Sequence, residues 1–467
     1  MKASFVTFTN DMKNPLMAYS SLTSYLNYKN IDVHIDSRII FCKRREKQTV
    51  HTNITDYTTD YIFGKTVDDI VDLKSIVTLF KNFDLEQDLT KNIDIPTYRN
   101  EMIKTLQKEA VELFDNDTVF FSVFRYHFLY HLFLAAYIKR INPNIKIVFG
   151  GPQIINSKQT INLLNNCPFI DYIVHGDVET GIYDYLTKPI NRIHYAKSLE
   201  LKDLQMPDYT DQPLFLFENQ VMITTSRNCF NKCSYCPSVY LPYKKAPLDS
   251  VDKWIKYYCN NNKVKSIYFT DAIFNSSAKR FNGIIDILLN RHKGQSFYIW
   301  CHSLGLTEDH IRKLSNLNFN HPGDIILAYD SASKTLCERI NRPTAENIDE
   351  LIDLFIFHGL NLSTFFIAGM PIETEDDFMI NYNKIKELRL KHQNKLNIAI
   401  HSLLFIPGSP FYEHYEDYNI NLEYWDNKTA NIYPPVKEIV KSIPRYYYGL
   451  VTPDELTRRV TMIDKWR

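Results

Sequence analysis

The sequence predicts an α/β protein that contains two successive series of parallel strands. Strand-like and helix-like segments alternate along most of the 467 residues, which is typical of parallel sheets covered by helices. Two glycines, Gly150 and Gly151, directly follow a buried-type strand of the first series. A loop with Cys229, Cys233 and Cys236 follows the first strand of the second series. A chain of this length favours two or three domains over one.

The first series opens with a β-α-β pattern. Residues 3–9 are predicted to form a strand and residues 15–28 a helix with apolar side chains at helical spacing. Residues 31–36 alternate like a second strand that ends at Asp36. Residues 42–95 are polar with weak periodicity, and we interpret them as a possible insertion.

The pattern resumes after this insertion and predicts a doubly wound parallel sheet for residues 1–190. The expected strands are 118–123, 144–149 and 171–174, and the expected helices are 98–114, a segment that ends at 140, 157–165 and 179–185. Ligands of such sheets bind beyond the carboxyl ends of the strands, where Ser122, Gly150 and Gly151 lie. Residues 191–218 are interrupted by prolines and are predicted to be a linker.

The cysteine loop indicates a metal centre. Three thiolates on one short loop can hold three irons of a 4Fe-4S cluster and leave the fourth iron open to a small molecule. A zinc site is the alternative, but structural zinc usually has four ligands, commonly as two pairs. The chain has no second pair at zinc-ribbon spacing, although His302 or another distant residue could complete such a site. The other five cysteines are scattered, which favours a metal or redox site over a disulfide framework.

Composition limits the partners. The chain has 54 Lys and Arg and 54 Asp and Glu, and therefore a formal net charge of zero. This balance argues against nucleic acid as the main partner. The sequence contains neither a signal-peptide pattern nor an apolar stretch long enough to span a membrane, so a cytoplasmic protein is expected.

A second α/β series begins at residue 219. Strands are expected at 220–226, 265–271, 296–302, 324–331, 362–367 and 398–405. Polar or small residues mark the ends of three of these strands: Asp271, the pair Asp330 and Ser331, and Gly369. Residues 416–467 form an aromatic-rich extension with a final helix from about residue 452.

The C-x-x-x-C-x-x-C spacing, with Tyr235 before the last cysteine, resembles the radical S-adenosylmethionine (SAM) superfamily, and so do the strand ends that follow it. The resemblance implies a partial (β/α)6 TIM-type barrel over 219–415, with the active site at the carboxyl ends of its strands. It implies a 4Fe-4S cluster on the three cysteines and SAM on the open iron. It also implies an external one-electron reductant such as flavodoxin or ferredoxin. The SAM contacts that it implies are Tyr235, Asp271, Asp330, Ser331, Arg342 and Gly369.

Several of these residues have ordinary structural explanations as well. Arg342 and Asp271 could be salt-bridge or cap residues of the barrel, and Ser331 could cap the following helix. Gly369 could simply serve the turn before Pro371.

The first domain resembles the cobalamin-binding domain that precedes the catalytic domain in many radical SAM enzymes. The resemblance rests on Ser122, on the two glycines and on segment 175–179, and it implies cobalamin binding by Ser122, Gly150 and Gly151. Loop 10–15 lacks the histidine that is the lower cobalt ligand in part of that family. If cobalamin binds, a histidine of this motif therefore does not hold the cobalt. The alternative is a retained scaffold that binds nothing.

His127 and His131 are four residues apart on an expected helix and could in principle ligate a metal. Their aromatic and apolar neighbours favour a packed or cofactor-lining role.

Together, the resemblances imply cobalamin-dependent C-methylation of an unactivated carbon. One SAM would methylate cobalamin, and a second would give the 5′-deoxyadenosyl radical that abstracts a substrate hydrogen. The alternative keeps the radical chemistry without methylation: rearrangement, cyclisation, epimerisation or peptide modification. A third interpretation is a non-catalytic metal-binding protein. The substrate would be a small molecule or a peptide, and the sequence does not identify it.

Overall fold

The structure is a computed structural model. It describes residues 1–9, 17–41, 107–123, 128–155, 161, 164–165, 167–210, 219–319, 323–403, 405–406, 408–424, 444–451 and 453–464. The expected insertion 42–95, loop 10–15 and His127 lie outside the described residues. The chain divides into two compact units. The first comprises Met1–Asn10, Lys29–Ser198 and Leu422–Tyr447, and the second comprises Asp11–Tyr28, Leu199–Asn421 and Tyr448–Arg467.

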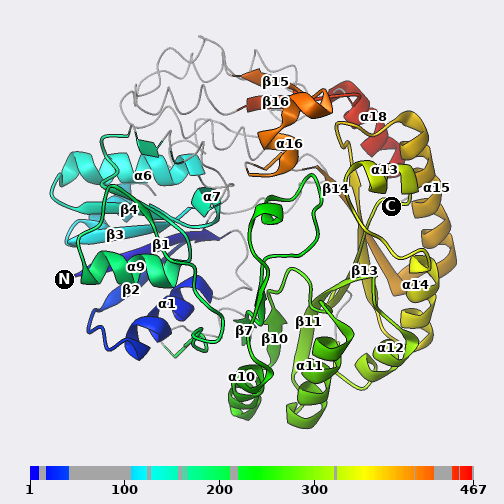
Figure 1. Cartoon of the computed structure of the whole chain (residues 1–467), viewed down its shortest axis with the longest axis horizontal. Coiled ribbons are helices and arrows are strands. Elements are labelled where there is room, and N and C mark those ends of the chain that lie inside the picture. Colours follow the sequence, from blue (N-terminus) through cyan, green and yellow to red (C-terminus); the bar gives the residue numbers. More distant parts are fainter. Residues whose placement is uncertain are drawn as a thin grey trace. The chain divides into compact units, whose positions relative to one another are not determined.

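The first unit contains a six-stranded parallel sheet of order β2-β1-β3-β4-β5-β6 (Figure 1). Its strands are β1 (Ala3–Thr9), β2 (Ile35–Phe41), β3 (Thr118–Ser122), β4 (Lys146–Gly150), β5 (Tyr172–His175) and β6 (Ile193–Tyr195). The direction of strand addition reverses between β1 and β3, which is where doubly wound sheets bind ligands. Two expectations were inaccurate. Asp36 lies near the start of β2 and not at its end, and β6 falls within the predicted linker.

Helices cover both faces of this sheet. The ring centroid of Phe121 in β3 lies 5.6 Å from that of His131 on α6 (Phe128–Ile141). The neighbouring Phe120 lies 5.4 Å from Tyr185 on α9 (Val178–Thr187). Consecutive strand residues point to opposite faces, so α6 and α9 pack on opposite sides. The predicted helix-covered parallel sheet is confirmed for this unit.

The second unit contains another six-stranded parallel sheet, in the consecutive order β7-β10-β11-β12-β13-β14. The strands are β7 (Gln220–Ile223), β10 (Ser266–Phe269), β11 (Ser296–His302), β12 (Ile325–Asp330), β13 (Leu362–Ala368) and β14 (Leu396–Ser402). The intervening helices are α10 (Leu248–Asn260), α11 (Ala278–Arg291), α12 (Glu308–Leu314), α13 (Lys334–Arg339), α14 (Ile348–Phe357) and α15 (Glu375–His392).

The outer faces of these strands are covered by the helices (Figure 1), and apolar side chains of both are buried. All six strands run in parallel, so their carboxyl ends lie along one edge. The boundaries agree closely with expectation, except that β7 ends before the predicted 226 and β14 begins and ends earlier than the predicted 398–405.

The remaining described elements are α1 (Met17–Tyr28), which belongs to the second unit, and the short helices α7 (Pro152–Ile155) and α16 (Pro410–Glu413). Two strands, β15 (Asn421–Tyr424) and β16 (Pro444–Tyr448), pair with each other. The predicted carboxyl-terminal helix is α18 (Pro453–Asp464).

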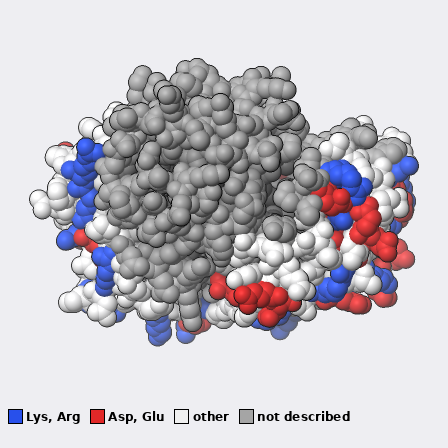
Figure 2. All heavy atoms as spheres, turned by 90° about the horizontal axis from the view of Figure 1, so that it is seen from above, with Lys and Arg blue, Asp and Glu red and all other residues white. Residues whose placement is uncertain are grey.

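The described surface carries charges of both signs. Acidic and basic side chains lie beside one another on the described surface in Figure 2, in line with the balanced net charge. None of the described helices is long and apolar enough to cross a membrane.

Candidate active site

A short antiparallel pair closes the base of the cysteine loop. After β7 the chain forms β8 (Ser226–Arg227), which pairs with β9 (Lys244–Lys245) on the far side of the loop. Asn228 begins the loop with a φ of 64°, a left-handed conformation in which asparagine is enriched. Its Nδ2 donates to the carbonyl of Pro242 at 2.9 Å. The loop therefore has a fixed entry and exit.

The three cysteines on this loop are free thiols. Cys233 is buried, whereas Cys229 and Cys236 are partly exposed. The loop is ordered by its own backbone: the amide of Cys236 donates to the carbonyl of Cys233 at 3.0 Å. The amide of Asn231 donates to Sγ of Cys229 at 3.3 Å. Burial raises the pKa of the Cys233 thiol to about 11, against the lowering effect of Arg342.

The cysteine loop also carries a side-chain hydrogen-bond donor. No set of three or more His, Cys, Asp or Glu side chains within the described ranges is placed to hold one metal ion. Asn231, which lies between Cys229 and Cys233, has a buried Nδ2 without a hydrogen-bond partner, so a donor is available to a group held there. Three free thiols and this donor match the chemistry of an iron–sulfur cluster.

Tyr235 and the buried Asp330 and Arg342 form a cluster beside Cys233. The Tyr235 hydroxyl donates to Oδ2 of Asp330 at 3.0 Å, and the same carboxylate is ion-paired with Arg342. Burial alone would lower the pKa of Arg342, but Asp330, Tyr235 and Cys233 outweigh it and raise that pKa. A fixed positive charge therefore lies close to a cysteine of the loop.

Asp330 takes this position through an irregular strand end. It has a φ of 65°, which costs energy for a residue other than glycine. The pairing of β12 with β13 shifts its register between Ala328 and Asp330. Such irregularities re-aim side chains. The ion pair and the tyrosine hydrogen bond hold the carboxylate in its unusual orientation.

Asp271 contacts the residues that lead from β7 into the cysteine loop. Its carboxylate accepts hydrogen bonds from the backbone amide of Thr225 at 2.6 Å and from the Ser226 hydroxyl at 2.9 Å. Burial raises the pKa of Asp271, opposed by these hydrogen bonds. Arg280 lies nearby and donates to the carbonyl of Thr225 at 2.7 Å. In this structure Asp271 therefore secures the strand end that leads into the cysteine loop.

Ser331 and Gly369 lie at the ends of neighbouring strands. The Ser331 hydroxyl donates to Oδ1 of Asn381 at 3.0 Å. Gly369 has a φ of 76°, and its amide donates to Oε2 of Glu373 at 3.1 Å. Both predicted site residues are thus held by side chains, Asn381 and Glu373, for which we expected no role.

Ser234 anchors the middle of the cysteine loop to two other segments. Its amide donates to the carbonyl of Ile340 at 2.8 Å, and its carbonyl accepts from the amide of Phe411 at 2.8 Å. Its hydroxyl accepts from the Tyr418 hydroxyl at 3.2 Å. The loop is therefore fixed to the turn that precedes Arg342. A serine inside a cysteine motif gives no sequence signal for this role.

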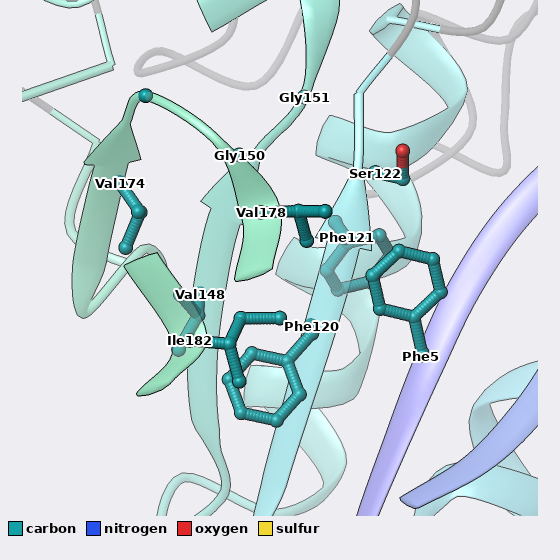
Figure 3. A pocket seen from close by; sticks show the side chains of 11 residues that line it. Phe5, Phe120, Phe121, Ser122, Val148, Gly150, Gly151, Val174, Val178 and Ile182 are labelled. Carbon is teal, nitrogen blue, oxygen red and sulfur yellow. The ribbon is translucent and has the colours of Figure 1, made fainter. Parts of the chain in front are cut away.

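The first unit has its own candidate site, an apolar hollow of about 330 Å³ including open solvent. It lies at the carboxyl ends of β3 and β4, with Ser122, Gly150 and Gly151 on its rim (Figure 3). Its walls are mostly apolar: Phe5, Phe120, Phe121, Val148, Val174, Val178 and Ile182. The structure therefore brings together the three residues that the sequence predicted for this unit.

The two glycines of this hollow differ in whether the backbone would tolerate a side chain. Gly151 has a φ of 102°, and a Cβ there would lie 2.7 Å from the backbone nitrogen of Val123. The fold itself demands glycine at this position. A Cβ at Gly150 would be in ordinary contact, 3.4 Å from the carbonyl oxygen of Val174. A Cβ at Gly150 is therefore compatible with the backbone, and Gly150 lines the hollow beside Val174.

A known family model matches part of the second unit. Residues 223–385 match the Radical SAM superfamily model, so the chain carries a radical SAM domain. That range begins at the end of β7 and ends within α15.

Among solved structures, the radical S-adenosylmethionine methyltransferase TsrM from Kitasatospora setae, with tryptophan substrate and a SAM analogue bound, has a similar fold. The TM-score is 0.63 at 13% identity, with 100% of this chain and 89% of that chain covered. Another structure of the same methyltransferase, with cobalamin and a [4Fe-4S] cluster bound, gives a TM-score of 0.58 at 12% identity and covers 91% and 81% of the two chains. At these identities the likeness concerns the fold.

Curated relatives are distant. A tRNA-2-methylthio-N(6)-dimethylallyladenosine synthase from Petrotoga mobilis is 23% identical over 58% of this chain and 63% of its own length. An uncharacterized methyltransferase from Pyrococcus horikoshii is 23% identical over 65% of this chain and 70% of its own length. The chain thus spans about three fifths of the first relative's length.

Proposed function

We propose that the chain is a radical SAM enzyme that uses cobalamin to methylate an unactivated carbon of a small-molecule or peptide substrate. One observation carries this proposal: a three-cysteine loop follows the first strand of a radical SAM domain, and its Tyr235 donates to the buried Asp330, which is paired with Arg342. The consecutive strand order of the second unit supports a partial (β/α)6 barrel around this site.

Cys229, Cys233 and Cys236 would hold a 4Fe-4S cluster. When an external reductant such as flavodoxin or ferredoxin reduces it, the cluster supplies the electron that cleaves SAM. Around it, Arg342 holds a positive charge beside Cys233, and Asp330 keeps that guanidinium in place. The guanidinium suits the carboxylate of SAM because its planar fork can bind two oxygens.

The remaining proposed SAM residues differ in how they contribute. Tyr235, Ser331 and Gly369 lie on the cysteine loop or at strand ends, as a SAM contact requires. Asp271 is the exception. Both of its carboxylate oxygens accept hydrogen bonds from Thr225 or Ser226, so we assign it the role of ordering the strand end before the loop.

The apolar hollow of the first unit supports cobalamin as the second cofactor. Ser122, Gly150 and Gly151, which all line the hollow, would accommodate the nucleotide tail, because glycine has no side chain to block its approach. Cobalamin, when bound, supplies a carrier for the methyl group. Loop 10–15 offers no histidine, so we assign no lower ligand from this motif.

The substrate class rests on charge alone. The balanced net charge favours a small molecule or a peptide over a polyanion. The similar proteins differ in this respect. The TsrM structure holds tryptophan, which is a small molecule, whereas the Petrotoga relative is named for a tRNA nucleoside.

Radical chemistry without methylation is the second candidate function. The sequence feature that favours it is the histidine-free loop 10–15, because part of the cobalamin family uses that histidine.

One product assay separates the two candidates. Purified protein with reconstituted cluster, cobalamin, SAM, reductant and substrate extract should release both S-adenosylhomocysteine and 5′-deoxyadenosine. Release of 5′-deoxyadenosine alone, with cobalamin bound, would favour the second candidate. Release of neither product by cluster-loaded protein would contradict both.

A further inference from the structure

A buried ion pair connects the carboxyl-terminal helix to the loop after β13. Arg459 of α18 and Glu373 are 3% and 1% exposed, and Nη1 lies 2.7 Å from Oε2. Burial raises the pKa of Glu373, and Arg459 opposes that rise. Removing one member of such a pair leaves an uncompensated buried charge, so the position of Glu373 depends on the helix.

From Glu373, hydrogen bonds reach two of the proposed SAM residues. Its Oε2 accepts from the amide of Gly369 at 3.1 Å, and its Oε1 accepts from Nδ2 of Asn381 at 3.2 Å. Oδ1 of Asn381 in turn accepts from the Ser331 hydroxyl at 3.0 Å and from the amide of Ala332 at 2.7 Å. A single carboxylate thus connects the loop after β13 with the loop after β12.

The same loop is held at a second point by the segment before α18. The amide of Leu450 donates to the carbonyl of Pro371 at 2.6 Å. Gly449 packs so closely that a Cβ there would lie 2.3 Å from that carbonyl oxygen. The carboxyl-terminal segment therefore holds residues 369–373 at two points, Pro371 and Glu373.

We propose that α18 positions the SAM-binding strand ends, with Arg459 and Glu373 as positioning residues that set the backbone at Gly369 and the hydroxyl at Ser331. This rests on the proposed function, since it assumes that SAM binds at these strand ends. It gives the carboxyl-terminal extension a role for which the sequence alone offered no sign.

The test compares Arg459→Met with the neighbouring Arg458→Gln. Arg458 is 43% exposed and pairs with Glu375 and Glu455, whereas the described ion pair to Glu373 comes from Arg459. SAM affinity is measured by anaerobic equilibrium dialysis with cluster-loaded protein of verified iron content. We expect Arg459→Met to weaken SAM binding about tenfold, a typical size for coupling between linked sites, and Arg458→Gln to change it less than twofold.

A conservative variant and the kinetics of SAM cleavage distinguish a positioning role of Arg459 from a purely stabilising one. Arg459→Lys keeps the charge but not the fork, so we expect a loss of about threefold. For both Arg459 variants, kcat of SAM cleavage at saturating SAM should stay within about twofold while KM rises. If Arg459→Met does not fold, the SAM affinity of Arg459→Lys tests the inference.

Unchanged SAM affinity in a folded, iron-loaded Arg459 variant would overturn the inference. Failure of the wild-type protein to bind SAM would overturn the proposed function instead.

Discussion

Asp330 shows how much one carboxylate determines at this site. It occupies a strained backbone conformation, receives the Tyr235 hydroxyl and pairs with the buried Arg342. Because the guanidinium is buried and stays charged, Asp330 is the main group that compensates its charge. Loss of Asp330 should therefore cost more folding free energy than loss of the tyrosine hydrogen bond.

Asp330→Ala is expected to lower the free energy of unfolding by about 3–5 kcal/mol, because it leaves Arg342 buried without its partner. Tyr235→Phe removes one hydrogen bond and should cost about 1 kcal/mol. Denaturant unfolding of the cluster-free proteins measures both values. Equal losses in the two variants would contradict the account.

The sequence predicted which residues gather here but not how they pair. The resemblance to the radical SAM superfamily indicated Tyr235, Asp330 and Arg342, and of these only Asp330 stands at a predicted strand end. That Arg342 pairs with Asp330 depends on a bulge in β12, and no local pattern encodes it. Asn381 and Arg459 gave no signal, since a helical Asn or Arg is ordinarily a surface residue.

At the scale of elements, α15 is held at its start by a capping box. The Thr374 hydroxyl accepts from the amide of Asp377, and the Asp377 side chain accepts from the amide of Thr374. Asp377 also pairs with Arg339 and accepts from the Thr335 hydroxyl at 3.0 Å. Burial would raise the pKa of Asp377, but hydrogen bonds from Ser333 and Thr374 outweigh it and lower that pKa.

This depressed pKa predicts an acid-dependent loss of stability. A folded-state pKa below the unfolded value contributes stability at neutral pH, and that stability is lost as the pH falls below about 4. Asp377→Asn should therefore be less stable than wild type at pH 7, and the difference should shrink at lower pH. Thermal unfolding across this pH range measures it. A difference that is constant with pH would contradict the assignment.

The glycine turn after β4 offers a second test at the scale of elements. Gly150→Val places a side chain at the rim of the hollow without backbone strain. We expect this variant to fold and to take up at least tenfold less cobalamin, as seen in the visible spectrum of protein purified from cobalamin-supplemented cells. Wild-type uptake would contradict the proposed cobalamin site.

Gly151→Ala is the contrasting variant for folding. Its Cβ would collide with the Val123 backbone in a left-handed conformation, so it should destabilise the first unit whether or not cobalamin binds.

At the scale of the whole molecule, two parallel sheets arise from two kinds of strand order. In the first sheet, the direction of strand addition reverses at β1, which is where doubly wound sheets bind ligands. In the second sheet, strands are added consecutively, and because all of them are parallel their carboxyl ends lie along one edge. Alternating strands and helices made both sheets predictable. The assignment of α1 to the second unit and of Leu422–Tyr447 to the first was not predictable, because contacts between distant segments leave no periodic pattern.

The central claim is that the cysteine loop supports SAM cleavage, and its most direct test is 5′-deoxyadenosine release by the reconstituted protein. We predict release by wild type with SAM and reductant, and by Cys259→Ala, whose cysteine is buried on α10 away from the loop. Cys233→Ala should release at least a hundredfold less, because one of the three cluster ligands is lost. Equal release by Cys233→Ala, or no release by iron-loaded wild type, would contradict the account.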